Sequence, residues 1–187
     1  MADVIIVRDR VPFPPHPAGQ YAATCVDVID LGERVESYAG SDPRVVSKLA
    51  LVFATSERRQ DGEHSTVSAE FTRSMHEKAS LRRFLEDWEG RSYARDHLEA
   101  GIPLHDLVGK PALITVEHRR STKGSAYAKI KGITPLPKSI PAVDIANYKR
   151  APHWEDRRKR YEAEVAKHED HARRPGAAVS IGDECPF

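Results

Sequence analysis

Basic and aromatic side chains alternate along one segment of the chain in a pattern that could bind a nucleic-acid strand. In the expected strand at 125–134, Tyr127, Lys129 and Lys131 share one face, and the opposite face is apolar. Single strands are held by cations that contact phosphates and by aromatic or Arg planes on which bases stack. The first face therefore predicts a nucleic-acid contact, and an ordinary solvated strand exterior is the alternative interpretation.

Further side chains extend this candidate nucleic-acid surface. Arg119, Arg120 and Lys123 lie in or beside the turn before that strand, the position at which an oligonucleotide-binding barrel clamps its ligand. Arg73 is a further candidate at the rim of this surface, since alternation places it on the same strand face as Phe71. The remaining basic candidates, and one loop aromatic that could stack on a base, are Lys48, Arg58, Arg59 and Tyr38.

No catalytic residue is predicted. The chain contains no Gly-rich phosphate loop and no His-Glu-x-x-His, Gly-x-Ser-x-Gly or Cys-x-x-Cys motif. Its two cysteines, Cys25 and Cys185, indicate neither a disulfide scaffold nor a zinc site. A metal-dependent nuclease built from Asp27, Asp30 and Glu70 stays open, because such carboxylates need only converge in space. We expect no metal and no cofactor.

Composition limits the class of protein. The chain has 187 residues, of which 40% are hydrophobic, so it can bury one moderate core. Its formal net charge of +1 makes the local placement of charge more informative than the total. No apolar run approaches the roughly 18 residues of a membrane span, and the run at 4–7 is too short for a signal peptide. We expect a soluble protein in the cytoplasm, with no membrane contact.

Periodicity divides the chain into strands and helices. Strands are expected at 20–30, 45–55, 66–73, 111–119 and 125–134. Between the third and fourth strands, one helical stripe is formed by Leu81, Phe84, Leu85 and Trp88. Ser74 and Glu77 have the spacing of a capping box at the start of this helix, and Gly90 would end it. Shorter helical stretches are expected at 93–100 and 104–108.

This order of elements predicts a mainly β fold of the α+β class. A five-stranded Greek-key oligonucleotide-binding (OB) barrel has a helix between strands three and four. SH3-like barrels and α+β sandwiches share the order and are the alternatives. The polar segments 33–44 and 57–65 would be hairpin loops.

Four parts are expected along the chain. They are an irregular Pro-rich lead-in, the OB domain, a linker with a charged helix, and a disordered tail, at 1–19, 20–137, 138–172 and 173–187. The charged helix, from about Trp154 to Ala172, offers little apolar surface to bury.

The acidic C-terminal tip ends in an aromatic residue. Asp183 and Glu184 precede Cys185, Pro186 and Phe187, and an exposed Phe at a flexible terminus is best explained as an anchor for a partner's apolar pocket. The tip resembles that of bacterial single-stranded DNA-binding proteins, an acidic run ending in Pro-Phe that holds replication and repair proteins. Here the acids are fewer than usual, and a cysteine stands where an aliphatic residue is typical. A chance Pro-Phe ending is the alternative.

Four stretches of the body carry a second resemblance, at 25–32 (CVDVIDLG), 77–90 (EKASLRRFLEDWEG), 107–112 (LVGKPA) and 127–130 (YAKI). They are similar to the OB-fold single-stranded DNA-binding proteins of tailed phages and prophages. The resemblance implies a protein that coats and protects single strands during phage DNA replication or recombination, and it supplies no catalytic residue. An RNA-binding module or a protein-interaction adaptor is the alternative. Edge strands leave room for a homo-oligomer.

Overall fold

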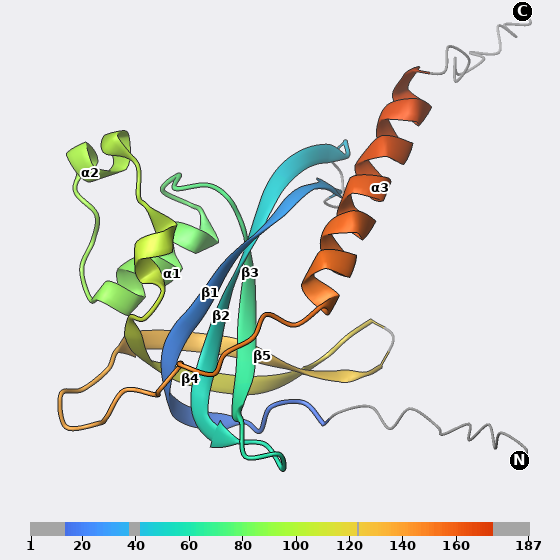
Figure 1. Cartoon of the computed structure of the whole chain (residues 1–187). Coiled ribbons are helices and arrows are strands. Elements are labelled where there is room, and N and C mark those ends of the chain that lie inside the picture. Colours follow the sequence, from blue (N-terminus) through green and yellow to red (C-terminus); the bar gives the residue numbers. More distant parts are fainter. Residues whose placement is uncertain (1–13, 38–41, 123, 174–187) are drawn as a thin grey trace, which may run out of the picture.

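The alternating and helical periods of the sequence produce an α+β fold (Figure 1). The computed structural model describes residues 14–37, 42–122 and 124–173. Within these ranges the strands are β1 (Gly19–Glu36), β2 (Arg44–Arg58), β3 (His64–Thr72), β4 (Pro111–Arg120) and β5 (Ala126–Pro135). The helices are α1 (Ser80–Glu89), α2 (Arg95–Ala100), the 3-10 helix η1 (Leu104–Leu107) and α3 (His153–Arg173).

The strands form one antiparallel sheet in the order β3-β2-β1-β4-β5. β1 is central because it pairs with β2 along most of its length and with β4 through residues 19–24. The edge strands β3 and β5 approach each other, with some of their Cα atoms within 8 Å, although no β3–β5 ladder joins them in the described part of the chain. The prediction of a five-stranded sheet with helices between the third and fourth strands is therefore confirmed.

One face of the sheet packs on α1. Leu81, Leu85 and Trp88 are buried there because they share one stripe of the helix. The Trp88 Nε1–H also donates a hydrogen bond of 2.9 Å to the carbonyl of Pro111 at the start of β4. These side chains join a core that includes the fully buried Phe53, so the predicted stripe does cover this face of the sheet.

α1 begins later than the sequence predicts, at Ser80. The expected capping box at Ser74 and Glu77 is wrong, because the Ser74 hydroxyl accepts a hydrogen bond from the backbone N–H of His76 and closes a local turn instead. At the other end, Gly90 adopts a φ of +67°, in the left-handed region that glycine enters without strain. The predicted glycine cap is confirmed.

β1 and β2 extend further than the sequence predicts. Residues 33–36 and Arg44 of the segment 33–44, expected to be a hairpin loop, are strand, with Glu33 opposite Ser47 and Glu36 opposite Arg44. Most side chains of this extension are partly or fully exposed, so polar residues are tolerated within it. Because these residues are polar, the sequence pattern did not reveal where β1 ends and β2 begins.

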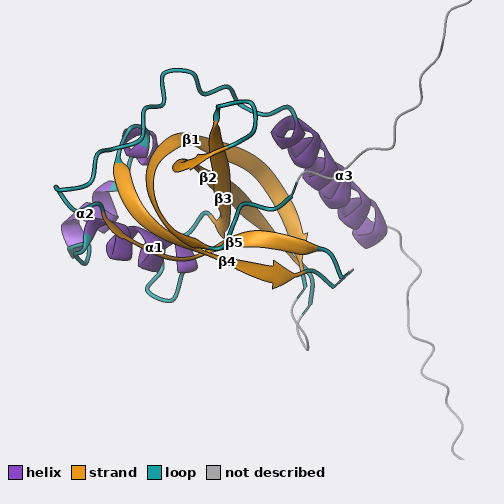
Figure 2. Cartoon of the chain, turned by 90° about the horizontal axis from the view of Figure 1, so that it is seen from below, coloured by secondary structure: helices purple, strands orange, loops and turns teal. Residues whose placement is uncertain are grey.

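The other face of β1 and β2 is covered by a C-terminal strap, which we define as residues 136–161 and which includes the first turns of α3. α1 and α3 consequently lie on opposite sides of the sheet (Figures 1 and 2). The strap and the strands share a second hydrophobic cluster, made of Ala22, Val26, Ile29, Leu31, Ala50, Val52, Ala54, Val143, Trp154 and Tyr161. The expectation that the charged helix has little to bury is wrong at Trp154 and Tyr161, which are 5% and 6% exposed.

Polar contacts also hold the strap, at two carboxylates of the sheet. Asp27 on β1 accepts two hydrogen bonds from the Arg150 guanidinium, at 2.7 and 2.6 Å, and one of 3.2 Å from the Tyr148 hydroxyl. Glu70 on β3 accepts a hydrogen bond of 3.0 Å from the Tyr161 hydroxyl. Burial and the Asp27 carboxylate raise the pKa of Tyr148 above its usual range, so its hydroxyl stays protonated and donates.

Candidate nucleic-acid interface

The outward face of the β4–β5 hairpin brings together several of the residues predicted to contact nucleic acid. Arg119 lies opposite Tyr127, and Glu117 lies opposite Lys129. Side chains directly opposite in an antiparallel pair share one face of the sheet. Tyr127 is 46% exposed, the largest value among the exposed large hydrophobic residues of the described part of the chain. We call Glu117, Arg119, Tyr127, Lys129 and Lys131 the hairpin face.

Lys131 reaches solvent at a β-bulge. The register of the two strands shifts between the pairs Thr115–Gly132 and Val116–Ile130, which leaves Lys131 without a partner residue on β4. Its side chain is exposed. Bulges of this kind are frequent at the edges of sheets, and the unpaired residue of this bulge, Lys131, is the third cation of the hairpin face.

Glu117 is an acidic member of this face that sequence reasoning missed. The Arg119 Nε–H donates a hydrogen bond of 2.6 Å to Glu117 Oε1. That hydrogen bond, together with the nearby charges of Arg119, Lys131 and Lys129, lowers the pKa of Glu117. The hairpin face therefore combines three cations with one carboxylate. Alternation could have found Glu117, because it stands two positions before Arg119 on the same strand face.

Two other predicted basic residues are engaged elsewhere in the fold. Lys48 is only 9% exposed, and its amine forms an ion pair with Glu36 and donates a hydrogen bond of 3.0 Å to the Thr72 hydroxyl. Arg73 lies 3.6 Å from Asp30, with both side chains exposed. Much of the positive charge of these two residues is balanced within the protein.

The remaining predicted arginines lie near the ends of strands. Arg58 ends β2 and Arg59 follows it at the start of the β2–β3 turn, where Arg58 donates a hydrogen bond of 2.6 Å to the Gly62 carbonyl and Arg59 lies 3.0 Å from Asp61. Arg120 ends β4 and is exposed. The predicted residues that lie outside the described ranges are Tyr38, Lys123, Asp183, Glu184, Pro186 and Phe187.

The carboxylates considered for a metal-dependent nuclease have structural partners. Asp27 is bound by Arg150, and Glu70 forms an ion pair with Arg157. Asp30 accepts a hydrogen bond from a backbone N–H two residues on. Across residues 14–37, 42–122 and 124–173, no group of three or more His, Cys, Asp or Glu side chains could hold a metal ion.

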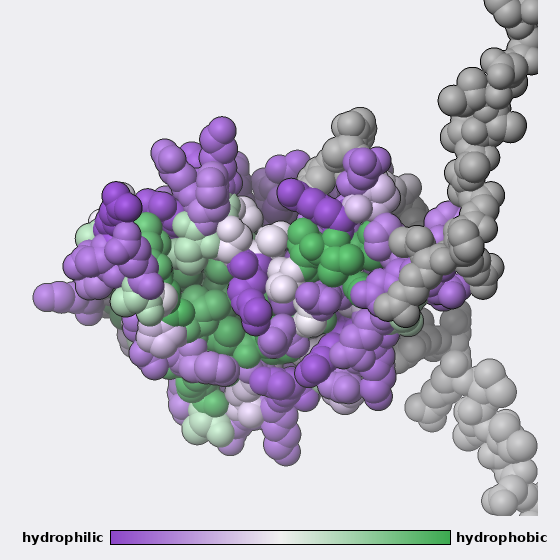
Figure 3. All heavy atoms as spheres, turned by 90° about the horizontal axis from the view of Figure 1, so that it is seen from above, coloured by the Kyte–Doolittle hydropathy of each residue, from purple (hydrophilic) through white to green (hydrophobic). Residues whose placement is uncertain are grey.

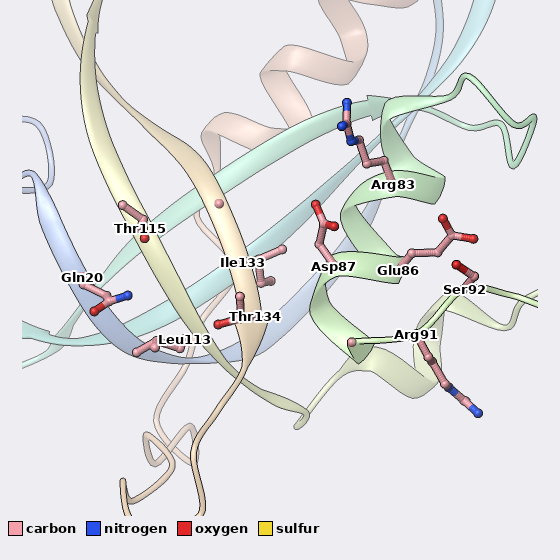
Figure 4. A pocket seen from close by; sticks show the side chains of 12 residues that line it. Gln20, Arg83, Glu86, Asp87, Arg91, Ser92, Leu113, Thr115, Ile133 and Thr134 are labelled. Atoms are coloured by element: carbon pink, nitrogen blue, oxygen red, sulfur yellow. The ribbon is translucent and has the colours of Figure 1, made fainter.

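A cavity of about 630 Å³ lies between α1 and the strands (Figure 4). Side chains of both signs line it, with Arg83 and Asp87 on α1 and Thr134 on β5. The Glu86 carboxylate accepts a hydrogen bond of 3.1 Å from the backbone N–H of Tyr93, which lowers the pKa of Glu86. This carboxylate therefore holds the loop after α1 in place.

On the face seen from above, hydrophobic areas are interrupted by hydrophilic side chains (Figure 3). No helix in the described ranges is both long and apolar enough to cross a membrane. Comparisons with protein-family models and with curated proteins gave no match.

Proposed function

We propose that the protein binds single-stranded DNA during phage replication or recombination, through a closed OB barrel whose hairpin face contacts the strand, and that it catalyses no reaction. The observation that carries the proposal is an exposed aromatic, Tyr127, with Arg119 opposite it on β4 and Lys129 and Lys131 further along β5. The cations would meet phosphates, and the phenol ring would stack on a base. The strand order and the approach of β3 to β5 support a barrel.

Accessibility favours the hairpin face over the other outward strand surface. OB barrels commonly bind oligonucleotides over strands two and three and their neighbouring loops. In this protein the strap buries the outward side chains Ala50 and Val52 of β2, and it also holds Glu70 of β3. A nucleic-acid strand would therefore meet the β4–β5 hairpin more readily than the centre of the β1–β2 surface.

Fluorescence anisotropy of a labelled oligo-dT across a salt series tests the proposal. We expect a steep loss of affinity with salt and a preference for single strands over duplex. Tyr127→Ala should weaken binding by roughly 5-fold to 150-fold, the equivalent of about 1–3 kcal/mol of stacking. Lys129→Ala should remove one phosphate contact and so reduce the slope of log affinity against log salt concentration by about one.

Lys159→Ala is the matched control, because Lys159 is an exposed lysine of α3, a helix that packs mainly on β1 and not on the β4–β5 hairpin. It should retain the affinity and salt slope of the unaltered protein. A preference for oligo-U of equal length would indicate an RNA-binding module. Absence of binding to either oligonucleotide would indicate a protein-interaction adaptor.

We propose further that the C-terminal tip recruits replication or recombination proteins. The support is the sequence, in which Asp183 and Glu184 provide charge and Phe187 an apolar anchor. Deletion of 183–187 should abolish capture of such proteins and leave single-strand affinity unchanged or slightly higher, because the acidic tip competes with phosphates for cations at low salt. Phe187→Ala should abolish capture without changing DNA affinity. Loss of DNA binding in the truncated protein would contradict this division.

A further inference from the structure

A groove separates the strap from the β2–β3 hairpin. Its volume is about 610 Å³, within the roughly 300–1,000 Å³ range of small-molecule sites. β2 and β3 contribute outward residues such as Ala54 and Thr66, and the strap contributes Tyr148, Lys149 and His153. We call this space the strap groove. It exists only because the C-terminal segment folds back across the sheet.

Cations on both walls of the strap groove are positioned to meet an anion. Arg58 lines it from the hairpin, and Lys149 lines it from the strap. Lys149 is exposed and forms no ion pair within the described residues. The lining also holds two acids, Glu63 and Asp144, against the three cations Arg58, Arg59 and Lys149. The Asp144 carboxylate is engaged in a local turn, where it accepts a hydrogen bond of 3.0 Å from the backbone N–H of Ala146.

The strap groove also offers surfaces that suit a nucleobase. The exposed His153 ring packs on the Trp154 indole, with ring centroids 4.7 Å apart and planes inclined by 39°. Val52 adds apolar surface to the lining. Thr66 and Ser68 on β3 supply hydroxyl groups that can bond the edge of a base. An apolar and aromatic lining flanked by cations matches the two parts of a nucleotide.

The position of the groove relates it to the hairpin face. β3 is the edge strand that β5 approaches, and outward residues of β3 line the groove. Outward residues of β5 belong to the hairpin face. The two surfaces are therefore carried by edge strands that lie next to each other.

We infer that the strap groove is a second contact for the same nucleic-acid strand, holding one nucleotide with its phosphate near Arg58 and Lys149 and its base against His153. The inference rests on the proposed function and assigns a binding role to the strap. A longer oligonucleotide would occupy both the hairpin face and the groove. A short one, near the lower end of the roughly 4–16 nucleotides that a single OB domain spans, would occupy the hairpin face alone.

Oligo-dT of about 5 and about 15 nucleotides, within the range of OB-domain site sizes, tests this inference by anisotropy. Lys149→Ala should weaken binding of the longer oligonucleotide by about 3-fold to 10-fold and lower its salt slope by about one, with little effect on the shorter one. Lys159→Ala removes the same charge from an exposed site of the same segment and should change neither affinity. Circular dichroism of both variants should match that of the unaltered protein.

Trp154 gives a direct readout of the groove. The chain has two tryptophans, and Trp88 lies in the core on α1, so Trp88→Phe leaves Trp154 as the sole tryptophan, which can be excited selectively. The longer oligo-dT should quench Trp154 fluorescence, and Lys149→Ala should shift that titration to higher concentration. The shorter oligo-dT should bind with much less quenching.

The outcomes distinguish the groove from the proposed function. If the unaltered protein binds oligo-dT while Lys149→Ala and Lys159→Ala behave alike and Trp154 is not quenched, the groove inference is overturned and the proposed function stands. If no oligonucleotide binds, both are overturned. If a synthetic Asp-Glu-Cys-Pro-Phe peptide quenches Trp154 and the longer oligo-dT does not, the groove holds an acidic peptide and the nucleotide inference is wrong.

Discussion

The outer surface of β1 and β2 and the hairpin face of β4 and β5 are both outward strand surfaces, yet their chemistry is opposite. The first is mainly apolar and lies under the strap, whereas the second carries three cations and an aromatic side chain that is 46% exposed. Burial is continuous along residues 22–27 of β1, but around Ile130 on β5 the flanking positions are exposed. A strand covered on both faces loses its alternation, and a strand covered on one face keeps it. The pattern of each strand thus indicates whether its outer face packs or stays available to a ligand.

The largest expected effect tests whether the strap is part of the core. Trp154→Ala should reduce the free energy of unfolding by about 3–5 kcal/mol, as large-to-small changes of buried aromatic residues do. The reason is that Trp154 is 5% exposed against β1 and β2. Urea denaturation followed by circular dichroism measures the change.

Tyr127→Ala is the matched control, because it removes an aromatic side chain from the hairpin face, where surface substitutions cost within about 0.5 kcal/mol. Equal losses in the free energy of unfolding for Trp154→Ala and Tyr127→Ala would contradict the conclusion that the strap-covered surface is packed and the hairpin face is not. A near-neutral Trp154→Ala would show that the strap detaches readily from the sheet.

A smaller effect is expected from the polar contact beneath the strap. Asp27→Asn removes the charge that accepts two hydrogen bonds from Arg150 and should cost about 1–2 kcal/mol. We expect this loss in the free energy of unfolding to be smaller than for a fully buried ion pair, because the Arg150 side chain is 57% exposed and solvent screens it. Denaturation of Asp27→Asn, Arg150→Ala and the double variant gives the coupling energy.

Arg158→Ala provides the comparison for this cycle, since its ion pair with Glu162 is exposed along one helix and should contribute roughly 0.2–0.5 kcal/mol. A coupling energy between Asp27 and Arg150 no larger than that would mean that apolar burial alone holds the strap.

The sequence predicts the elements that are covered on one face and misses those that depend on distant partners. The stripe of α1 and its Gly90 cap were recognisable because every signal is local. The docking of α3 was not, since Trp154 and Tyr161 are two helical turns apart with mostly charged residues between them. The signal that could have revealed it lies on another element. The unbroken small and apolar run at 22–26 of β1 needs cover on both faces.

The sequence likewise predicts some residues of the candidate site correctly and misses the interactions of others. Alternation alone placed Tyr127 and Lys129 on one exposed face, and the structure shows both exposed. Lys48 looked equally free in the sequence, because its ion-pair partner Glu36 fell within a segment predicted to be a loop, whereas in the structure Glu36 belongs to β1, the strand that pairs with β2. Long-range register decides which cations are paired, and a sequence pattern does not contain that register.

The smallest expected effect concerns the one carboxylate of the hairpin face. Glu117→Gln keeps the shape of the side chain and removes the negative charge that engages Arg119, so oligo-dT affinity should rise by about 2-fold to 3-fold at low salt. The gain should fade as salt approaches 1 M, where the screening length is about 3 Å. The unfolding midpoint should change little, because the interaction that is lost is an ion pair with Arg119, whose side chain is 58% exposed.

The pH dependence of this gain has a definite sign. The hydrogen bond from Arg119 and the neighbouring lysines lower the pKa of Glu117 below its usual value of about 4.3, so the carboxylate stays charged at any pH above that value. The difference between Glu117→Gln and the unaltered protein should therefore be constant from about pH 8 to pH 5 and shrink only below the usual value, as Glu117 takes up a proton. Anisotropy titrations at a series of pH values measure it. A gain that disappears already near pH 6 would mean that another titrating group controls the hairpin face, and an affinity lowered by Glu117→Gln would mean that Glu117 orients Arg119 for phosphate and does not compete with it.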